Sequence, residues 1–440
     1  MAESRLVLDM NARQWGVIGA AWLGWGFDVF DALLFNYVAA NCITSLLHLQ
    51  LGTPEAKQAT IFWTGVASSV LLIFAAIGGI TFGRIADRIG RSRTMLLTMG
   101  LYAVATAFCA LSPNLGVLIA LRAVAALGIG GEWAAGASMV AEVVPEHRRV
   151  QAGALLYTAA PIGLFLATAV NSAIAGHWLK GDPTTSWRWV FAAGIIPAVV
   201  ALLIRIGLRE PERWHAVKEA PTRFAELFSP EVRRQTLSGL AMALTGMLMW
   251  WGCNAFIPLI AGGIGDATAV AQGLKGADRQ ALIEGTKTTA TNLFNMGGLI
   301  GTIITVPISQ ILGRRPMYAA YFVLSAVAIF ASFGMKWSPE TTLYLYFPIG
   351  LTVFGVFGSF TYYLPELFPT RLRASGAGFC YNAGRVLASV GPFVVGSIAA
   401  RGADAFASAT QVMSYIAIVP LLGLLALPFA VETKGKVLAD

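Results

Sequence analysis

Twelve apolar stretches run along the chain, each close to the length of about 20 residues that a membrane-spanning helix needs. They lie near residues 16–40, 60–82, 94–112, 115–140, 151–175, 187–208, 236–262, 286–312, 317–335, 342–364, 374–399 and 408–430. Only 12% of the 440 residues are charged, against about 25% in soluble domains, and the mean hydropathy is +0.67. The sequence therefore predicts an all-α membrane protein with twelve transmembrane helices in a lipid bilayer.

The longest polar segment of the chain covers residues 208–236 and divides the twelve spans into two groups of six. We expect an N-terminal six-helix bundle over 1–208, a cytoplasmic linker over 209–235 and a C-terminal six-helix bundle over 236–440. The two bundles should be pseudo-symmetric if they arose by duplication, and the sequence holds traces of such a repeat.

The repeat is clearest where "AEVVPEHRRVQAGALLY" at 141–157 is echoed by "PELFPTRLRASGAGFCY" at 365–381, an offset of 224 residues. "WGFD" at 25–28 likewise precedes "WGCN" at 251–254 by 226 residues. A duplicated six-helix unit is typical of secondary transporters, which bind their substrates near the midplane between the two halves.

The basic residues are distributed unevenly between the two sides of the predicted membrane. With the N-terminus in the cytoplasm, 21 of the 31 Lys and Arg residues fall on the cytoplasmic side and 8 on the opposite side, while Arg122 and Arg385 lie inside spans. The positive-inside rule then predicts that both termini are cytoplasmic. The net charge of +8 reflects topology, so we expect no nucleic-acid partner.

Patterns that would indicate an enzyme or a cofactor are missing from the sequence. The four cysteines (Cys42, Cys109, Cys253 and Cys380) are isolated in or beside spans, and the four histidines have no ligand spacing. "GIGGE" at 128–132 neither follows a strand nor opens a helix, so it does not predict a nucleotide site. We expect no catalytic residue, no cofactor and no metal.

"GRIADRIGRSR", residues 83–93, joins the second and third spans on the cytoplasmic side. It closely resembles the signature loop of the major facilitator superfamily, Gly-x-x-x-Asp-Arg-x-Gly-Arg-Arg. The candidate gating residues of this loop are Gly83, Asp87, Arg88, Gly90 and Arg91. Asp87 can dock against a helix N-terminus or an arginine when the cytoplasmic face is closed. The alternative is that the arginines only set the topology.

Further gating candidates lie in "EVVPEHRR" and "ELFPTRLR", at the cytoplasmic ends of spans 4 and 10, where the superfamily places Pro-Glu-x-x-x-Arg-like elements. They are Glu142 with Arg149, Glu366 with Arg373, and Arg314 in the second copy of the signature loop. An ordinary ion pair at the membrane interface is the alternative for each pair.

Charged residues inside spans are expensive, at about 2.5–3.5 kcal/mol each at the centre of a helix. Asp28 lies near the midplane of span 1, and Asp31 follows at i+3 and so faces the same way. Two adjacent carboxylates favour one shared proton. We therefore predict that Asp28 and Asp31 couple transport to protons, with Glu132 on span 4 as a further candidate.

Arg385 lies about eleven residues into span 11, near the midplane of the other half. Its guanidinium fork matches the two oxygens of a carboxylate, so we expect a small carboxylate substrate. The candidate substrate-binding residues are Arg385, Arg122, Tyr381, Asn382, Asn254, Asn292, Asn295 and Tyr157. Ion pairing that only holds helices together is the alternative, above all for Arg122, which has Asp31 as a possible partner.

"GWGFDVFDALLF" at 24–35 with "GIGGEWAAGASMVAE" at 128–142 resembles the sialate and metabolite proton-symporter branches of the major facilitator superfamily. The related aromatic-acid symporters carry Asp-Gly-x-Asp in span 1. Here Trp25 replaces their first aspartate and Asp31 is additional, which favours the sialate-like pattern. The resemblance implies proton-coupled symport of a small organic acid by alternating access across the cell inner membrane. We expect a monomer.

Two other functions stay open at this point. One is a sugar or drug carrier of the same superfamily, including one that works by proton antiport, although Arg385 favours an anion over a cationic drug. The other is a transport-like receptor, which usually carries a long cytoplasmic extension, whereas about ten residues follow span 12 here.

Overall fold

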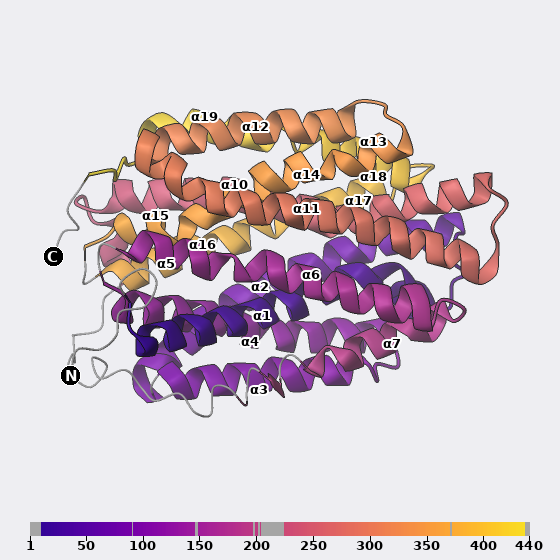
Figure 1. Cartoon of the computed structure of the whole chain (residues 1–440), viewed down its shortest axis with the longest axis horizontal. Helices are drawn as coiled ribbons and strands as arrows, with labels where there is room; N and C mark the ends of the chain where they lie inside the picture. The colour runs from indigo at the N-terminus through magenta and orange to yellow at the C-terminus, as the bar shows by residue number, and fades with distance from the viewer. Residues whose placement is uncertain are drawn as a thin grey trace.

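The chain folds into a bundle of long helices that run along its longest axis (Figure 1). The structure is a computed structural model that describes residues 10–89, 91–145, 148–196, 199–200, 203, 224–369 and 372–435. These residues contain helices and connecting segments, and no strand. The all-α prediction is therefore confirmed.

The helices before residue 200 form one side of the bundle, in indigo to magenta in Figure 1; we call them the N-terminal half. They are α1 (Ala12–Leu46), α2 (Pro54–Ile89), α3 (Arg91–Cys109), α4 (Leu115–Val143), α5 (Arg149–Tyr157), α6 (Ala159–Asn171), the π-helical segment η3 (Ser172–Trp178) and α7 (Pro183–Ala193). Asparagine side chains begin two of them: Asn11 caps α1 by accepting a hydrogen bond from the Gln14 backbone N–H, and Asn114 caps α4 in the same way through Val117.

The helices after residue 224 form the other side, in pink to yellow; we call them the C-terminal half. They are η4 (Phe224–Phe228), α10 (Arg233–Ala271), α11 (Gly276–Leu312), α12 (Arg314–Gly334), α13 (Pro339–Tyr344), α14 (Tyr346–Ile349), η5 (Gly350–Phe354), η6 (Gly355–Ser359), α15 (Phe360–Glu366), α16 (Arg373–Ala388), α17 (Val390–Ala399), α18 (Ala405–Tyr415), α19 (Ile418–Ala426) and η8 (Leu427–Phe429).

The predicted spans fall on these helices, although the helix ends differ from the predicted ones. Within the described residues, eight segments are long and apolar enough to cross a membrane, and 93–109 and 115–131 are shorter apolar helices. Span 6 begins on α7 but continues into 197–208, most of which lies outside the described residues, and span 11 is divided between α16 and α17. Residues 204–223 are also outside, so the limits of the two bundles and of the linker stay predictions.

The signature stretch 83–93 is more helical than the predicted loop. α2 continues to Ile89 and α3 begins at Arg91, which leaves Gly90, itself outside the described residues, as the only position between them. Gly83 lies inside α2, and a Cβ at this position would meet nothing within 4 Å.

Small residues let the backbones approach closely, as is common in membrane bundles. A Cβ on Gly130 of α4 would lie 1.8 Å from the Ala75 carbonyl oxygen of α2, and one on Gly78 would lie 2.0 Å from that of Leu127. The glycines of "GIGGE" therefore serve helix packing. Between the halves, a Cβ on Gly65 of α2 would lie 2.5 Å from the Pro392 carbonyl oxygen of α17.

The described chain begins and ends at the same end of the bundle, where α1 starts and the segment after α19 runs (Figure 1). We call this the terminal end, and the opposite end, where α1 leads into α2 and α10 into α11, the distal end. Contacts between the two halves occur at both ends.

Candidate functional site

A cavity of about 60 Å³ lies between the two halves and is lined by residues of α1, α2, α4, α5, α6, α10, η6 and α16. This volume is on the scale of a few water molecules, so the halves are closed around it. Aromatic side chains from both halves dominate its wall: Trp25, Tyr157, Trp250, Trp251, Phe357 and Tyr381. Of the described residues that line it, two are charged, Asp28 from α1 and Arg385 from α16.

The aromatic rings around the cavity contact one another edge to face. Trp25 and Tyr157 of the N-terminal half have ring centroids 4.8 Å apart with planes at 87°, and Trp250 and Trp251 of the C-terminal half are also 4.8 Å apart, at 85°. Tyr157 reaches across to Phe357, at 6.1 Å. Such pairs are favourable by about 0.5–1.5 kcal/mol beyond their buried area, so the wall is an ordered aromatic surface that continues from one half to the other.

Arg385 is placed as the sequence predicts, at the cavity, but its neighbours are only partly those expected. Its guanidinium lies 4.6 Å from the centroid of the Tyr381 ring, a cation–π arrangement. Its Nη1 is buried, and no protein atom among the described residues accepts a hydrogen bond from it. Asn382, expected to orient the substrate beside Tyr381, is not among the lining residues: its Nδ2 donates to the Gly378 carbonyl at 3.0 Å, and its side chain lies against Gly79 of α2.

The two aspartates of α1 occupy different surroundings, which corrects the expectation that they act as one pair. Asp28, only 2% exposed, lines the central cavity. Asp31, 1% exposed, is instead 3.4 Å from Nη1 of Arg122 and accepts a hydrogen bond from the Thr106 hydroxyl at 2.7 Å. Residues at i and i+3 share a helix face only broadly, and here Asp28 lines the cavity while Asp31 contacts Arg122 of α4 and Thr106 of α3.

Arg122 belongs to the interior of the N-terminal half and does not line the central cavity. Its Nη2 donates to the carbonyl oxygens of Asp31 and Ala32, at 2.9 and 2.7 Å, and the residue is 2% exposed. The alternative reading of Arg122, an ion pair with Asp31, is the one that the structure supports. A second, smaller cavity of about 10 Å³ beside Arg122 includes Asn36 and Ser68 in its wall.

The predicted asparagines lie between helices and not in the cavity wall. Asn254 of α10 accepts a hydrogen bond from Asn36 of α1, 3.3 Å away, and so joins the halves. Asn295 of α11 is fully buried, and Asn292 is partly buried with its Oδ1 inaccessible to solvent. Of the eight predicted substrate-binding residues, the structure brings together Arg385, Tyr381 and Tyr157.

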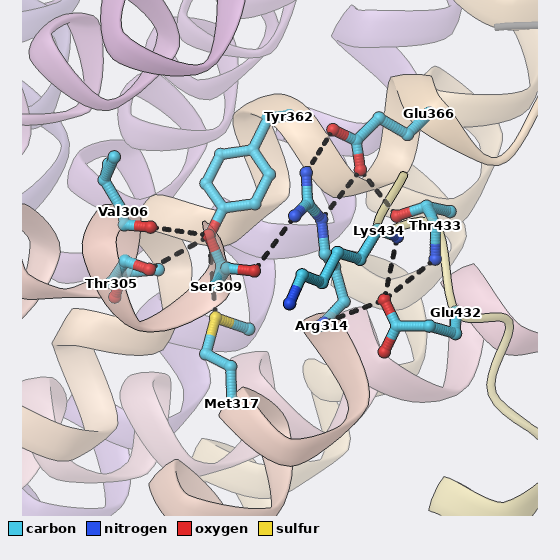
Figure 2. Close-up of polar contacts among 10 residues, drawn as sticks. All are labelled: Thr305, Val306, Ser309, Arg314, Met317, Tyr362, Glu366, Glu432, Thr433 and Lys434. Atoms are coloured by element: carbon cyan, nitrogen blue, oxygen red, sulfur yellow. Dashed lines mark hydrogen bonds and ion pairs between the residues drawn. The ribbon is translucent and has the colours of Figure 1, made fainter. Parts of the chain in front are cut away.

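At the terminal end of the C-terminal half, Arg314 and Glu366 form a bidentate ion pair (Figure 2). Arg314 Nη2 lies 2.7 Å from Glu366 Oε1 and its Nε 3.1 Å from Oε2, while Nη1 donates to the Ser309 carbonyl. Such fork-shaped pairs are among the strongest charge-assisted contacts. The expected partner of Glu366 was Arg373, so the pairing is corrected; Arg373 lies at the start of α16.

Glu432, for which no sequence pattern predicted a role, follows the last helix and ties it to this cluster (Figure 2). Its carboxylate accepts hydrogen bonds at 2.9 Å from the backbone N–H groups of Arg314 and Arg315, the first residues of α12. Thr433 donates from its hydroxyl to Glu366 at 2.6 Å, and Lys434 to the Ile311 carbonyl at 2.7 Å. An acidic residue at a helix N-terminus is favourable, but the sequence does not show which helix it will meet.

The pKa of Glu432 follows from this position. Burial alone would raise it, but four backbone N–H groups, those of Arg314, Arg315, Lys434 and Thr433, donate to the carboxylate and hold the pKa below its usual value of 4.5. The charged form of Glu432 is therefore bound more tightly in the folded protein than the neutral form.

Several gating candidates cannot be placed at the level of side chains. Gly90 lies outside the described residues, and so do the side chains of Asp87, Arg88, Arg91, Glu142 and Arg149 and that of the coupling candidate Glu132. The roles predicted for them stay predictions.

Comparison with known proteins agrees with this architecture. Residues 29–392 match the family described as Major Facilitator Superfamily. A probable 4-methylmuconolactone transporter of Cupriavidus pinatubonensis is 26% identical over 94% of this chain and 90% of its own length. The cis,cis-muconate transport protein of Acinetobacter baylyi is 29% identical over 85% of each chain.

The crystal structure of a D-xylose-proton symporter has the same fold, with a TM-score of 0.74 over 96% of this chain and 99% of that one. The identity is only 18%, so this likeness concerns the fold alone. Since the family match extends over most of the chain and the related sequences are named as transporters, the chain belongs to the major facilitator superfamily and is a multi-pass membrane transporter.

Proposed function

We propose that the protein is a secondary active transporter that carries a small organic acid anion together with protons by alternating access. The observation that carries this proposal is the charge arrangement of the central cavity. The N-terminal half contributes a carboxylate, Asp28, and the C-terminal half contributes a guanidinium, Arg385, to the same cavity. Because the two charges come from different halves, each can respond to how the halves are placed.

Arg385 is the proposed substrate ligand. A buried guanidinium N–H that no described protein atom satisfies is costly unless a ligand or water accepts from it, and a carboxylate fits the fork of donors best. The aromatic wall formed by residues such as Trp25 and Tyr157 suits a flat, unsaturated acid that packs against ring faces and edges. The names of the muconate and muconolactone relatives are in keeping with such an acid.

Asp28 is the proposed proton site. A substrate carboxylate that enters the cavity brings a second negative charge near Asp28, and like charges at short range favour protonation of one of them. The anion and the proton then enter together, and Arg385 is neutralised by the substrate. Asp31 is a weaker candidate for the proton site, because its carboxylate is already paired with Arg122 and hydrogen-bonded to Thr106 inside the N-terminal half.

The alternative is a sugar or drug carrier of the same superfamily, including one that works by proton antiport. A thermal-shift measurement on the purified protein separates the two, because a ligand that binds the folded state raises its stability. We expect cis,cis-muconate, benzoate or sialate to raise the melting temperature, and D-xylose to leave it unchanged.

Arg385→Ala should abolish the shift produced by the acids. Arg401→Ala, which removes an exposed arginine of the same half, is the matched control and should keep it. A shift with D-xylose and none with any acid would refute the organic-acid proposal.

We also propose that the protein lies as a monomer in the cell inner membrane with the terminal end in the cytoplasm. The positive-inside distribution of Lys and Arg supports this orientation. The native cysteines are all buried, so cysteines placed at exposed Gln50, at the distal end, and at exposed Arg234, at the terminal end, report the sides. In intact cells an impermeant maleimide should label the first and not the second; the reverse pattern contradicts the orientation.

A further inference from the structure

A row of polar side chains runs along one face of α11 and faces the N-terminal half. Its members are spaced by four, three, four and four residues, which keeps them on one side of a helix: Gln280, Glu284, Lys287, Thr291 and Asn295. α11 packs on α6 and η3, and polar contacts join it to α1. The row begins at the distal end and descends toward the middle of the bundle.

Two opposite charges lie in this row and are almost completely buried. Glu284 is 0% exposed and Lys287 is 3% exposed, and their side chains are 2.7 Å apart. Three groups of the N-terminal half complete their contacts. Asn171 donates to Glu284 Oε2 at 2.9 Å, Asn41 donates to Oε1 at 3.5 Å, and Lys287 Nζ donates to the Tyr37 carbonyl at 3.1 Å.

The strong contact of this cluster lies within the C-terminal half, and the weaker contacts cross between the halves. The ion pair itself lies within one helix, so it stays intact when the halves separate. The contacts across the interface join each charge to neutral groups: the amides of Asn41 and Asn171 donate to Glu284, and Lys287 donates to the Tyr37 carbonyl. Water replaces these neutral partners when the interface opens, so that little net free energy is lost. A contact of this kind holds the distal end closed yet permits it to open, as a transporter requires.

We propose that Glu284, Lys287, Asn41 and Asn171 form a distal lock, which sets how often the transporter opens at the distal end. The proposal rests on the alternating access of the proposed function, but not on the identity of substrate or coupling ion. The ion pair Lys180–Asp278 also crosses between the halves at this end, at 3.6 Å, but its side chains are 42% and 75% exposed, so water already competes for it and it contributes little.

Removing one component of the distal lock should favour the open state. In Asn171→Leu, one oxygen of Glu284 has no donor from α6 while the interface is closed, but water hydrates this oxygen when the interface opens. The closed–open equilibrium should therefore shift roughly tenfold toward the open state. Lys287→Met leaves the Glu284 charge uncompensated in the closed state, so the shift should be larger. Glu284→Leu combined with Lys287→Met removes both charges and should return the equilibrium toward closed.

The experiment measures labelling of Thr291→Cys in purified protein whose four native cysteines are replaced. Thr291 is 4% exposed and its hydroxyl is 3.5 Å from that of Thr168 across the interface, so a maleimide reaches it only when the distal end opens. We expect roughly tenfold faster labelling in Asn171→Leu, still faster labelling in Lys287→Met, and at most about twofold in the exposed control Asp278→Asn.

A second reporter separates opening from general loosening of the bundle. Thr361 of α15 lies against Gly153 of α5, where the halves meet at the terminal end, and a Cβ on that glycine would be 3.1 Å from the Thr361 hydroxyl. If the lock variants favour the distal-open state, labelling of Thr361→Cys should fall or stay the same. Faster labelling at both reporters means that the cluster only stabilises the fold and overturns the proposal.

Unchanged labelling of Thr291→Cys in a folded Asn171→Leu protein overturns it as well. Asn171→Leu keeps both charges paired, so it decides the question even if Lys287→Met does not fold. The assay uses no substrate and no pH gradient. Its failure is therefore distinct from a failure of the proposed transport function, which the thermal-shift measurement tests.

Discussion

The charged residues of the two halves are arranged alike in one respect and differently in another. Each half contains acid–base pairs whose two partners both belong to it, such as Asp31–Arg122 in the N-terminal half and Arg314–Glu366 in the C-terminal half. Among the described residues, each half also presents one charge to the central cavity, but the N-terminal half presents the carboxylate of Asp28 and the C-terminal half the guanidinium of Arg385.

The difference between the two kinds of charge lies in where their partners are. A pair whose partners belong to one half moves with that half as a rigid unit, so it stabilises the half in every conformation. A charge that faces the other half changes its surroundings whenever the halves move, so it can bind a ligand or a proton in one state and release it in another. The first kind should affect stability and the second kind transport.

The largest effect is expected for the internal pair of the N-terminal half. Arg122→Met leaves the buried Asp31 carboxylate without its counter-charge, which should lower the free energy of unfolding by about 3–5 kcal/mol. Denaturation of the purified protein in detergent measures it. Asp31→Leu combined with Arg122→Met removes both charges and should recover most of the loss. Wild-type stability of the single variant would erase the distinction between internal and cavity charges.

The cavity charge of the C-terminal half should affect binding and leave folding intact. Arg385→Ala is expected to weaken binding of the acid at least about a hundredfold, or about 2.7 kcal/mol, because the charge-assisted hydrogen bonds are lost. Arg385→Lys keeps the charge without the fork and should lose about tenfold. Calorimetry on purified protein measures both. Unchanged affinity in a stable Arg385→Ala protein would show that Arg385 does not bind the substrate.

The cavity charge of the N-terminal half should affect coupling. One proton per substrate gives at most about tenfold accumulation per unit of pH gradient, or about 1.4 kcal/mol. Asp28→Asn should lose this accumulation while keeping substrate exchange, because the amide cannot bind and release a proton. Uptake and counterflow in proteoliposomes measure the two activities. If Asp28→Asn accumulates normally and a folded Asp31→Asn protein does not, the two aspartates have the opposite roles.

The smallest effect is expected at the terminal end of the C-terminal half. The pKa of Glu432 is lowered in the folded protein, so its stabilising contribution is present above the unfolded value and disappears as the pH falls through the folded value. Because the side chain is partly exposed, we expect Glu432→Gln to lose less than about 1 kcal/mol near neutral pH. Melting curves of both proteins should converge as the pH falls through the lowered folded pKa of Glu432. A constant difference at all pH values would contradict a role for the charge.

Much of the fold could be predicted from the sequence, because length and hydropathy alone decide whether a helix can span a bilayer. The twelve apolar stretches and the repeat at an offset near 224 residues predicted an all-α transporter with two related halves. Arg385 and Tyr381 at the cavity were predicted because they lie deep within an apolar span, where a charge or a polar ring needs a specific reason to be.

Pairing between distant helices could not be predicted in this way. The i+3 spacing placed Asp28 and Asp31 on one face of α1, but the tertiary structure directs one to the cavity and the other to Arg122, 91 residues further along the chain. Asn382 follows Tyr381 directly and yet faces α2. Glu432 meets the start of α12, more than a hundred residues before it in the sequence.

The distal lock shows most plainly what the sequence determines and what only the tertiary structure determines. Hydropathy predicted a span over 286–312, because the preceding residues are polar, and so gave neither Glu284 nor Lys287 a role. In the structure α11 begins at Gly276, and the added turns carry Glu284, which pairs with Lys287, into the interface with α1 and α6. The sequence determined that this segment crosses the membrane, since that depends on the polarity of the segment alone. Only the tertiary structure decided that its polar end is buried, because Asn41, Asn171 and the Tyr37 carbonyl of the other half provide the hydrogen bonds that make burial of a charged pair possible.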